Sequence, residues 1–175
     1  MIKRLGVLAL LLLPIVLSGC GEDGCNQDEV AEFLDTFERN EERWYNALRL
    51  AENTARIALS DRIADLQDIT DDLRDIEAPE CTQEFSQAVL TYRELTIEYL
   101  IDFMSDEPES RQARSYSAAL EAELVVVEEM AKLYHEAELF ERYAEMSGIT
   151  VEEAEADLNE MVEMIQEQSE EEGEE

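Results

Sequence analysis

The sequence predicts an all-α protein: an antiparallel four- to five-helix bundle that follows an N-terminal signal helix and ends in a disordered acidic segment. Apolar residues recur three or four positions apart along most of the 175 residues, which is the spacing of one helix face. No strand-like alternation of apolar and polar residues persists. Six glycines and three prolines are too few for the many turns of a β sandwich or barrel.

The first 19 residues have the composition of an export signal. A basic start precedes an apolar run over residues 5–17, which is shorter than the roughly 20 residues that a membrane-spanning helix needs. The run ends in Leu17-Ser18-Gly19-Cys20, which resembles the lipobox of bacterial lipoproteins. The resemblance implies a diacylglycerol on the thiol of Cys20 and cleavage just before it. The alternative is an ordinary secretory signal with an incidental cysteine.

The residue after the lipobox bears on the location of the mature chain. Gly21 rather than aspartate follows Cys20, and by the same resemblance this implies the outer membrane of a two-membrane bacterium. In a one-membrane host the domain faces outward. We therefore expect an extracytoplasmic domain, anchored by lipid in the bacterial cell envelope. The chain then divides into a cleaved signal peptide (1–19), a lipidated spacer (20–27), a helical bundle domain (28–167) and an acidic disordered tail (168–175).

The charge excludes some classes of partner. The chain has 45 acidic and 13 basic residues, a formal net charge of −32, and two of those bases leave with the signal peptide. Nucleic acid is excluded as a default partner, because phosphate binding needs clustered Lys and Arg. Electrostatic docking on anionic lipid is disfavoured for the same reason. The expected membrane contact is therefore the lipid on Cys20.

The first long helical pattern, over residues 28–77, contains neither glycine nor proline. One straight helix there would hold Cys25 and Cys81 roughly 75 Å apart, whereas a disulfide needs Cα atoms about 5.5 Å apart. A hairpin within residues 51–61, with Ser60 as an N-cap, would bring the two cysteines together. We favour the hairpin and a Cys25–Cys81 disulfide in an oxidising compartment; the alternative is a long rod with two free thiols.

Further helical patterns follow. Pro79 ends the first region, and residues 106–108 form a turn between the next two helices. Gly148 stops the third pattern, and Thr150 with Glu153 forms a capping box that opens the last helix. The predicted core-facing residues are Phe85, Val89, Tyr92, Thr96, Tyr99 and Phe103, then Ala113, Leu120, Leu124, Val127, Tyr134, Ala137 and Phe140, then Val151, Ala154, Leu158, Met161 and Ile165.

A second resemblance covers roughly residues 25–110. It is carried by Cys25, Trp44, Thr54-x-Arg56-Ile57-x-Leu59, Leu66-Gln67-x-Ile69, Pro79-x-Cys81 and Phe103-Met104. This combination resembles a group of small exported helical proteins of environmental bacteria, many of them predicted lipoproteins. The resemblance implies that Cys25 pairs with Cys81, and it implies no particular chemistry.

Candidate catalytic and metal-binding residues are few. His135 is the single histidine, and Lys132 stands where a Glu-x-x-His metal motif needs its glutamate. The sequence has no His-Glu-x-x-His motif and no Gly-x-Ser-x-Gly motif. The acidic pairs Asp71-Asp72, Glu128-Glu129 and Glu152-Glu153 suit solvated helix faces, with weak calcium or magnesium binding as the alternative. We expect a structural His135, and no catalytic residue, metal ligand or cofactor.

Two further groups of residues have open alternatives. Trp44, Tyr92, Tyr99, Phe103 and Tyr134 are predicted in the core, or else along a groove between helices. Met161 and Met164 on the last helix suit contact with a partner, although marginal packing explains the same pattern. The expected function is a non-catalytic interaction or structural domain with an unknown envelope protein partner. The competing functions are binding of a ligand or divalent cation, and an enzyme that uses carboxylates alone.

The lipid anchor gives the first testable prediction. Intact-mass analysis of protein extracted from membranes should show an N-terminus at Cys20 that carries acyl chains, because two or more chains are needed for stable anchoring. A Cys20→Ser variant is the control and should stay unacylated. Mature, unacylated wild-type protein released into the medium would contradict the prediction.

Overall fold

The structure, a computed structural model, describes the backbone of residues 26–172 and the side chains of residues 26–161 except residue 146. Within this range it contains six α-helices and no strand, which confirms the all-α class. The predicted signal peptide and the predicted lipidation site Cys20 lie outside the described residues.

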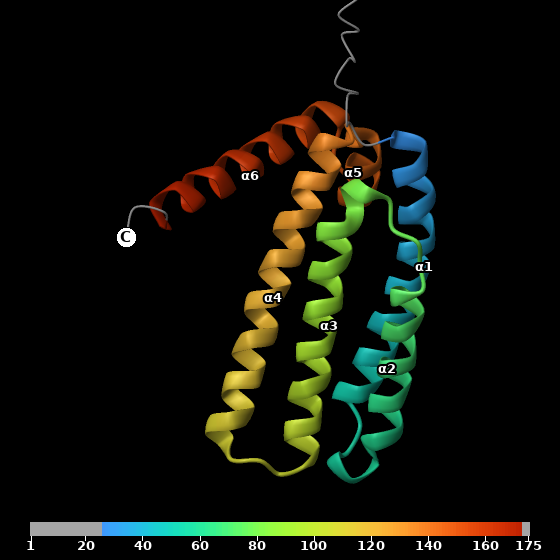
Figure 1. The fold of residues 1–175 in the computed structure, drawn as a ribbon, viewed down its shortest axis with the longest axis vertical. Helices are drawn as coiled ribbons and strands as arrows, with labels where there is room; N and C mark the ends of the chain where they lie inside the picture. The colour runs from blue at the N-terminus through green and yellow to red at the C-terminus, as the bar shows by residue number, and fades with distance from the viewer. Residues whose placement is uncertain (1–25, 173–175) are drawn as a thin grey trace, which may run out of the picture.

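Four long helices form the bundle, and consecutive helices run antiparallel (Figure 1). They are α1 (Gln27–Glu52), α2 (Ser60–Arg74), α3 (Gln83–Met104) and α4 (Glu109–Glu136). The two remaining helices cover the end of the bundle where α1 begins and α4 ends; they are α5 (Phe140–Ser147) and α6 (Val151–Glu172). Beyond its first turns α6 projects away from the bundle (Figure 1), and it continues past the predicted domain end at residue 167.

The first helical region is a hairpin, as favoured from the sequence. α1 ends at Glu52, and a turn with one 3-10 segment, η1 (Arg56–Ala58), leads into α2. The side chains of Asn53 and Thr54 donate hydrogen bonds to backbone carbonyls four residues earlier, at 2.7 and 2.6 Å. Such short polar side chains compete with the helix backbone and help to end it. Ser60 is the first residue of α2 and makes no capping hydrogen bond, so its predicted role as N-cap is wrong.

Cys81 lies in a second 3-10 segment, η2 (Glu80–Thr82), between α2 and α3. It is partly buried and disulfide-bonded. The other two cysteines of the chain, Cys20 and Cys25, both precede the described residues. The hairpin returns the chain to the end at which α1 begins, so the pairing of Cys81 with Cys25 stays a prediction that the fold permits.

The turn between α5 and α6 follows the sequence prediction. Gly148 has a φ of +70°, and its N–H donates to the carbonyl of Ala144 at 2.8 Å. Thr150 Oγ1 accepts from the backbone N–H of Glu153 at 3.3 Å, and the Glu153 carboxylate accepts from the backbone N–H of Thr150 at 2.9 Å. The hydrogen bonds from Thr150 lower the pKa of Glu153. The left-handed glycine stop and the capping box are therefore confirmed.

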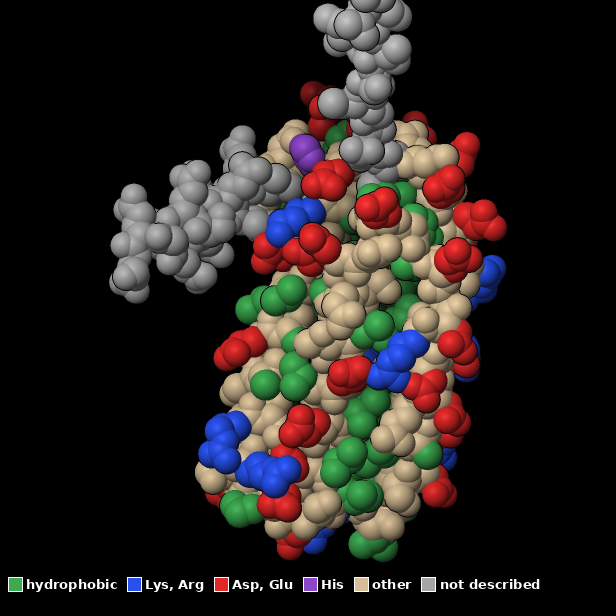
Figure 2. All heavy atoms as spheres, viewed as in Figure 1, with side chains coloured by type: hydrophobic (Ala, Val, Ile, Leu, Met, Phe, Trp, Pro, Cys, Tyr) green, Lys and Arg blue, Asp and Glu red, His purple; other side chains and the backbone are tan. Residues whose placement is uncertain are grey.

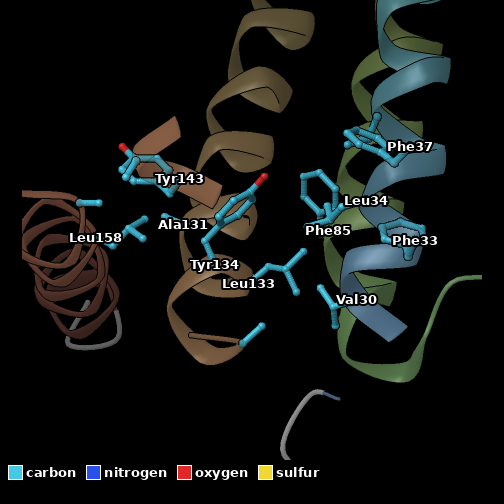
Figure 3. Packing of buried hydrophobic residues seen from close by; sticks show 14 of the residues in the cluster. Val30, Phe33, Leu34, Phe37, Phe85, Ala131, Leu133, Tyr134, Tyr143 and Leu158 are labelled. Atoms are coloured by element: carbon cyan, nitrogen blue, oxygen red, sulfur yellow. The ribbon is translucent and has the colours of Figure 1, made fainter. Parts of the chain in front are cut away.

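The core has two apolar clusters. The first lies at the end covered by α5 and α6, where Tyr134 and Leu133 of α4 stand between α1 on one side and Tyr143 and Leu158 on the other (Figure 3). The second lies nearer the opposite end and takes its buried side chains from α1, α2, α3 and the turn after α1. These are Trp44, Ala47, Ala51, Leu59, Ile63, Leu66, Ile69, Ile97 and Leu100. α4 contributes no buried residue to this second cluster.

The predicted core stripe of α4 is wrong over its first half. Leu120, Leu124 and Val127 are 43%, 71% and 41% exposed, and Phe103 on α3 is 38% exposed. The small residues Ala119 and Ala122 are buried instead. Small side chains let two helices approach closely, so α4 packs on α3 through its alanines and turns its larger apolar residues outward. α4 also ends earlier than predicted, at Glu136, so Ala137 lies in the turn and Phe140 opens α5.

The hairpin generates a prediction about the disulfide. Cys25→Ser and Cys81→Ser should each lower the free energy of unfolding, by up to about 4 kcal/mol, because the bridge closes a long loop in the unfolded chain. The double variant should lose no more than either single variant. Alkylation without reductant followed by mass analysis gives an independent measurement. Full alkylation of both thiols in unreduced protein would contradict the pairing.

Candidate functional site

The acidic pairs and His135 take part in local contacts. Nε2 of His135 lies 2.9 Å from Oδ1 of Asn159, so the ring links α4 to α6. Lys132 binds Glu128 at 2.7 Å and Glu129 at 2.9 Å. Asp71 and Asp72 are more than half exposed and form ion pairs, Asp71 with Arg74 and Asp72 with Arg43. Among the described side chains, no group of His, Cys, Asp and Glu is arranged to hold a metal ion.

The least expected group in the structure is the buried guanidinium of Arg93. This α3 side chain is 0% exposed. One nitrogen donates to Oδ1 of Asn40 at 2.6 Å, and another pairs with the carboxylate of Glu41. The guanidinium carbon lies 4.8 Å from the centre of the Trp44 ring. The side-chain amide of Asn40 in turn donates to the backbone carbonyl of Ile69 at 3.1 Å, which connects α1, α2 and α3.

This network forms a polar layer between the two apolar clusters. On α3, Arg93 stands between Val89 of the first cluster and Ile97 of the second. Burial lowers the pKa of Arg93, and the charge of Glu41 opposes that shift. Nε of Arg93 and Nε1 of Trp44 find no hydrogen-bond partner among the described residues. Some of the buried hydrogen-bond donors in this layer are thus unpaired. The layer therefore lowers the stability of the fold and is sensitive to substitution.

Sequence reasoning missed Arg93, although one signal was present. Glu41 interrupts the apolar spacing of α1 between Phe37 and Trp44, at a position where the pattern favours an apolar residue. A carboxylate inside a core stripe indicates a buried partner of opposite charge. Arg93 itself gave no signal, because an arginine beside an apolar stripe is ordinarily exposed.

A second buried charge, Asp102, stabilises the turn between α3 and α4. Its side chain is 3% exposed, and it accepts from the hydroxyl of Ser115 at 2.5 Å and from Nε of Arg111 at 3.0 Å. The Ser115 hydrogen bond, followed by the hydrogen bond and charge of Arg111, lowers the pKa of Asp102. Both of its partners lie in the first turns of α4, so these contacts join the end of α3 to the start of α4. We interpret Asp102 as a structural clamp.

A groove of about 220 Å³ opens between α1 and α4, with α3 as its floor. The rings of Tyr99 and Tyr116 contact each other across the α3–α4 contact, with their centres 5.3 Å apart and their planes tilted by 55°. Burial, followed by the charge of Glu123, raises the pKa of Tyr92 to about 12. The residues that line the groove are Leu48, Glu52, Tyr92, Thr96, Tyr99, Leu100, Tyr116, Ala119, Leu120 and Glu123.

The groove decides between the two predictions for the aromatic residues. Trp44 and Tyr134 are buried, with 0% and 3% exposure, as predicted for the core. Tyr92 and Tyr99 have the same helical spacing but are half-buried and line the groove. Met161 packs against the first cluster, which favours the packing interpretation for that residue, while the side chain of Met164 lies outside the described residues.

A larger open recess lies between α1 and α5. It has a volume of about 1130 Å³, and most of its charged lining residues are acidic. Its one basic lining residue, Arg142, binds Asp35 at 2.9 Å and Glu38 at 2.6 Å, so α5 is tied to α1 there. The pairing explains Arg142 as a structural contact, and the rest of the recess is a solvated acidic surface.

The buried layer generates a prediction about stability. Glu41→Gln should lower the free energy of unfolding by about 3 kcal/mol, because it leaves Arg93 buried without its counter-charge. Arg93→Met should lower the free energy of unfolding by less in the Glu41→Gln variant than in the wild type. The measurement is chemical denaturation of the two single variants and the double variant. The same cycle on the exposed pair Arg62–Asp65 is the control and should give a coupling below about 0.5 kcal/mol. Equal couplings for the two pairs would contradict the prediction.

Two further findings bear on identity. Within residues 26–172, no helix is both long and apolar enough to cross a membrane. Comparison with known proteins found no matching family model, no matching curated protein and no matching solved structure.

Proposed function

We propose that this chain is a lipid-anchored protein of the bacterial cell envelope, whose helical domain works by binding another envelope protein and not by catalysis. The observation that carries the proposal is an uncovered apolar stripe on α4. We define the α4 stripe as Tyr116, Leu120, Leu124 and Val127, which are 50%, 43%, 71% and 41% exposed. Figure 2 shows hydrophobic side chains at the surface over α4, and further hydrophobic side chains lie among acidic and basic ones on the same face of the molecule.

The spacing of the α4 stripe supports a binding surface. Residues four and then three positions apart lie on one face of a helix, so the stripe is continuous over about three turns. Further along α4, the same face carries Ala131 and Tyr134, which are buried under α5 and α6. The face is thus covered by helices at one end and uncovered at the other. Contiguous exposed apolar surface of this kind marks sites of protein contact, and an amphipathic helix is the partner that such a face fits.

The predicted anchor places this surface away from the membrane. Cys20 precedes Asn26 by six residues, which span at most about 20 Å. α1 then runs for 26 residues, or about 39 Å, toward the opposite end of the bundle. The end covered by α5 and α6 therefore lies nearer the lipid. The α4 stripe, residues 116–127, occupies the middle of α4, beyond the part of the helix that α5 and α6 cover, where a partner can approach.

A second candidate function is binding of a small ligand, and the groove between α1 and α4 is the observation that favours it. The groove shares Tyr116 and Leu120 with the α4 stripe, and it also contains aromatic and acidic side chains that a protein contact does not require.

The proposed function is tested by crosslinking in cells. A photo-crosslinking amino acid at position 124 of the full, lipidated chain should capture a discrete partner that mass spectrometry identifies. The same amino acid at Asp68, an exposed position on α2, is the control and should capture none. Leu120→Ser should weaken capture from position 124 while leaving the thermal midpoint nearly unchanged, because Leu120 is 43% exposed. The same set of captured proteins from both positions would overturn the proposal.

A further inference from the structure

We propose that the groove between α1 and α4 binds a small alkylammonium cation, with its methyl groups against tyrosine rings and its charge near Glu52 and Glu123. This inference rests on the proposed function in one respect, which is that the domain acts by binding. It adds the chemical class of one small ligand, which the α4 stripe does not indicate.

The aromatic side chains are the first reason. Tyr92 and Tyr99 come from α3 and Tyr116 comes from α4, and all three line the same groove. The face of an aromatic ring carries partial negative charge and attracts a cation within about 6 Å of its centre. Tyr99 and Tyr116 lie close enough together, with centres 5.3 Å apart, to contact one small ligand at once.

The charges of the lining are the second reason. Glu52 on α1 and Glu123 on α4 stand on opposite walls, and neither forms an ion pair within the part of the chain that the structure describes. No lysine, arginine or histidine is among the lining residues. The nearby Arg93 already donates hydrogen bonds to Glu41 and Asn40. Burial and the charge of Glu123 raise the pKa of Tyr92 to about 12, so its ring stays neutral well above neutral pH. The lining therefore carries negative charge and no positive charge, which favours a cation over an anion.

Size and polarity distinguish an organic cation from other occupants. The volume of about 220 Å³ is below the 300–1,000 Å³ of pockets for drug-sized molecules, so it suits a small ion. Leu100, Ala119 and Leu120 supply an apolar surface where the methyl groups of an alkylammonium ion can pack. A calcium ion needs about six to eight oxygen ligands, and two carboxylates on opposite walls do not supply them.

The test is a titration of the purified full chain, held in nanodiscs, with choline. Calorimetry at physiological salt measures binding, and the fluorescence of Trp44, whose ring centre is 6.5 Å from that of Tyr92, reports on the groove. We expect saturable binding of choline. The neutral molecule of the same shape, 3,3-dimethylbutan-1-ol, should bind at least tenfold more weakly. Equal binding of the two molecules would overturn recognition of the charge, and absence of choline binding would overturn the proposal.

Matched variants locate the site. Glu123→Gln should weaken choline binding at least fivefold, whereas Glu121→Gln, an exposed residue outside the groove on the same helix, should leave it unchanged. Tyr99→Leu should weaken binding by a similar factor. If Tyr99→Leu does not fold, Glu123→Gln still decides, because its side chain is exposed. Equal losses in the Glu121 and Glu123 variants would show diffuse attraction to an acidic surface and would overturn the proposal.

The ligand and the proposed function can fail separately. Capture of a partner from position 124 without choline binding leaves the proposed function standing and overturns the ligand. Choline binding that depends on Glu123, without capture of any partner, supports the ligand and overturns the protein-binding role of the α4 stripe.

Discussion

The buried Arg93 guanidinium sets the arrangement of the other helices. A fully desolvated arginine costs several kcal/mol unless it is paired, and here the pairing requires Asn40 and Glu41 of α1 at one particular height along α3. Asn40 also reaches the backbone of Ile69 in α2, so three helices share one register. The two apolar clusters on either side could tolerate small shifts, since apolar contacts are not directional. The hydrogen bonds of the layer cannot, and they therefore supply specificity more than stability.

The same layer explains why the bundle is open on one side. The large side chains of Trp44 on α1 and Arg93 on α3 lie between these two helices, with the guanidinium carbon 4.8 Å from the ring centre. α4 instead approaches α3 closely through Ala119 and Ala122. α3 thus contacts α1 through large side chains and α4 through small ones. As a result, α1 and α4 do not close over α3 in this half of the molecule. The groove and the outward-facing α4 stripe both result from this asymmetry.

The two ends of the bundle consequently differ in character. At the end near the predicted anchor, α5 and α6 cover α4, and Arg142 ties α5 to α1. Beyond this covered end, over the middle of α4, apolar side chains reach the surface beside Glu52 and Glu123, which form no ion pair with the described residues. In the proposed envelope protein, this uncovered face is the surface for other molecules, and the acidic charge around it favours neutral or cationic ones.

The sequence by itself determined the features that depend on near neighbours in the chain. The all-α class, the left-handed stop at Gly148 and the Thr150–Glu153 capping box each need only a few consecutive residues to form, whereas the turn after Glu52 is favoured over one long helix only through the distant Cys25 and Cys81. The tertiary structure alone decided which face of α4 is buried and that Arg93 is in the core. Tyr99 and Tyr134 have equivalent spacing in the sequence, yet one lines a groove and the other is buried. Burial depends on side chains that are dozens of residues away in the sequence. Helical periodicity identifies the apolar face of a helix but not which element packs against it.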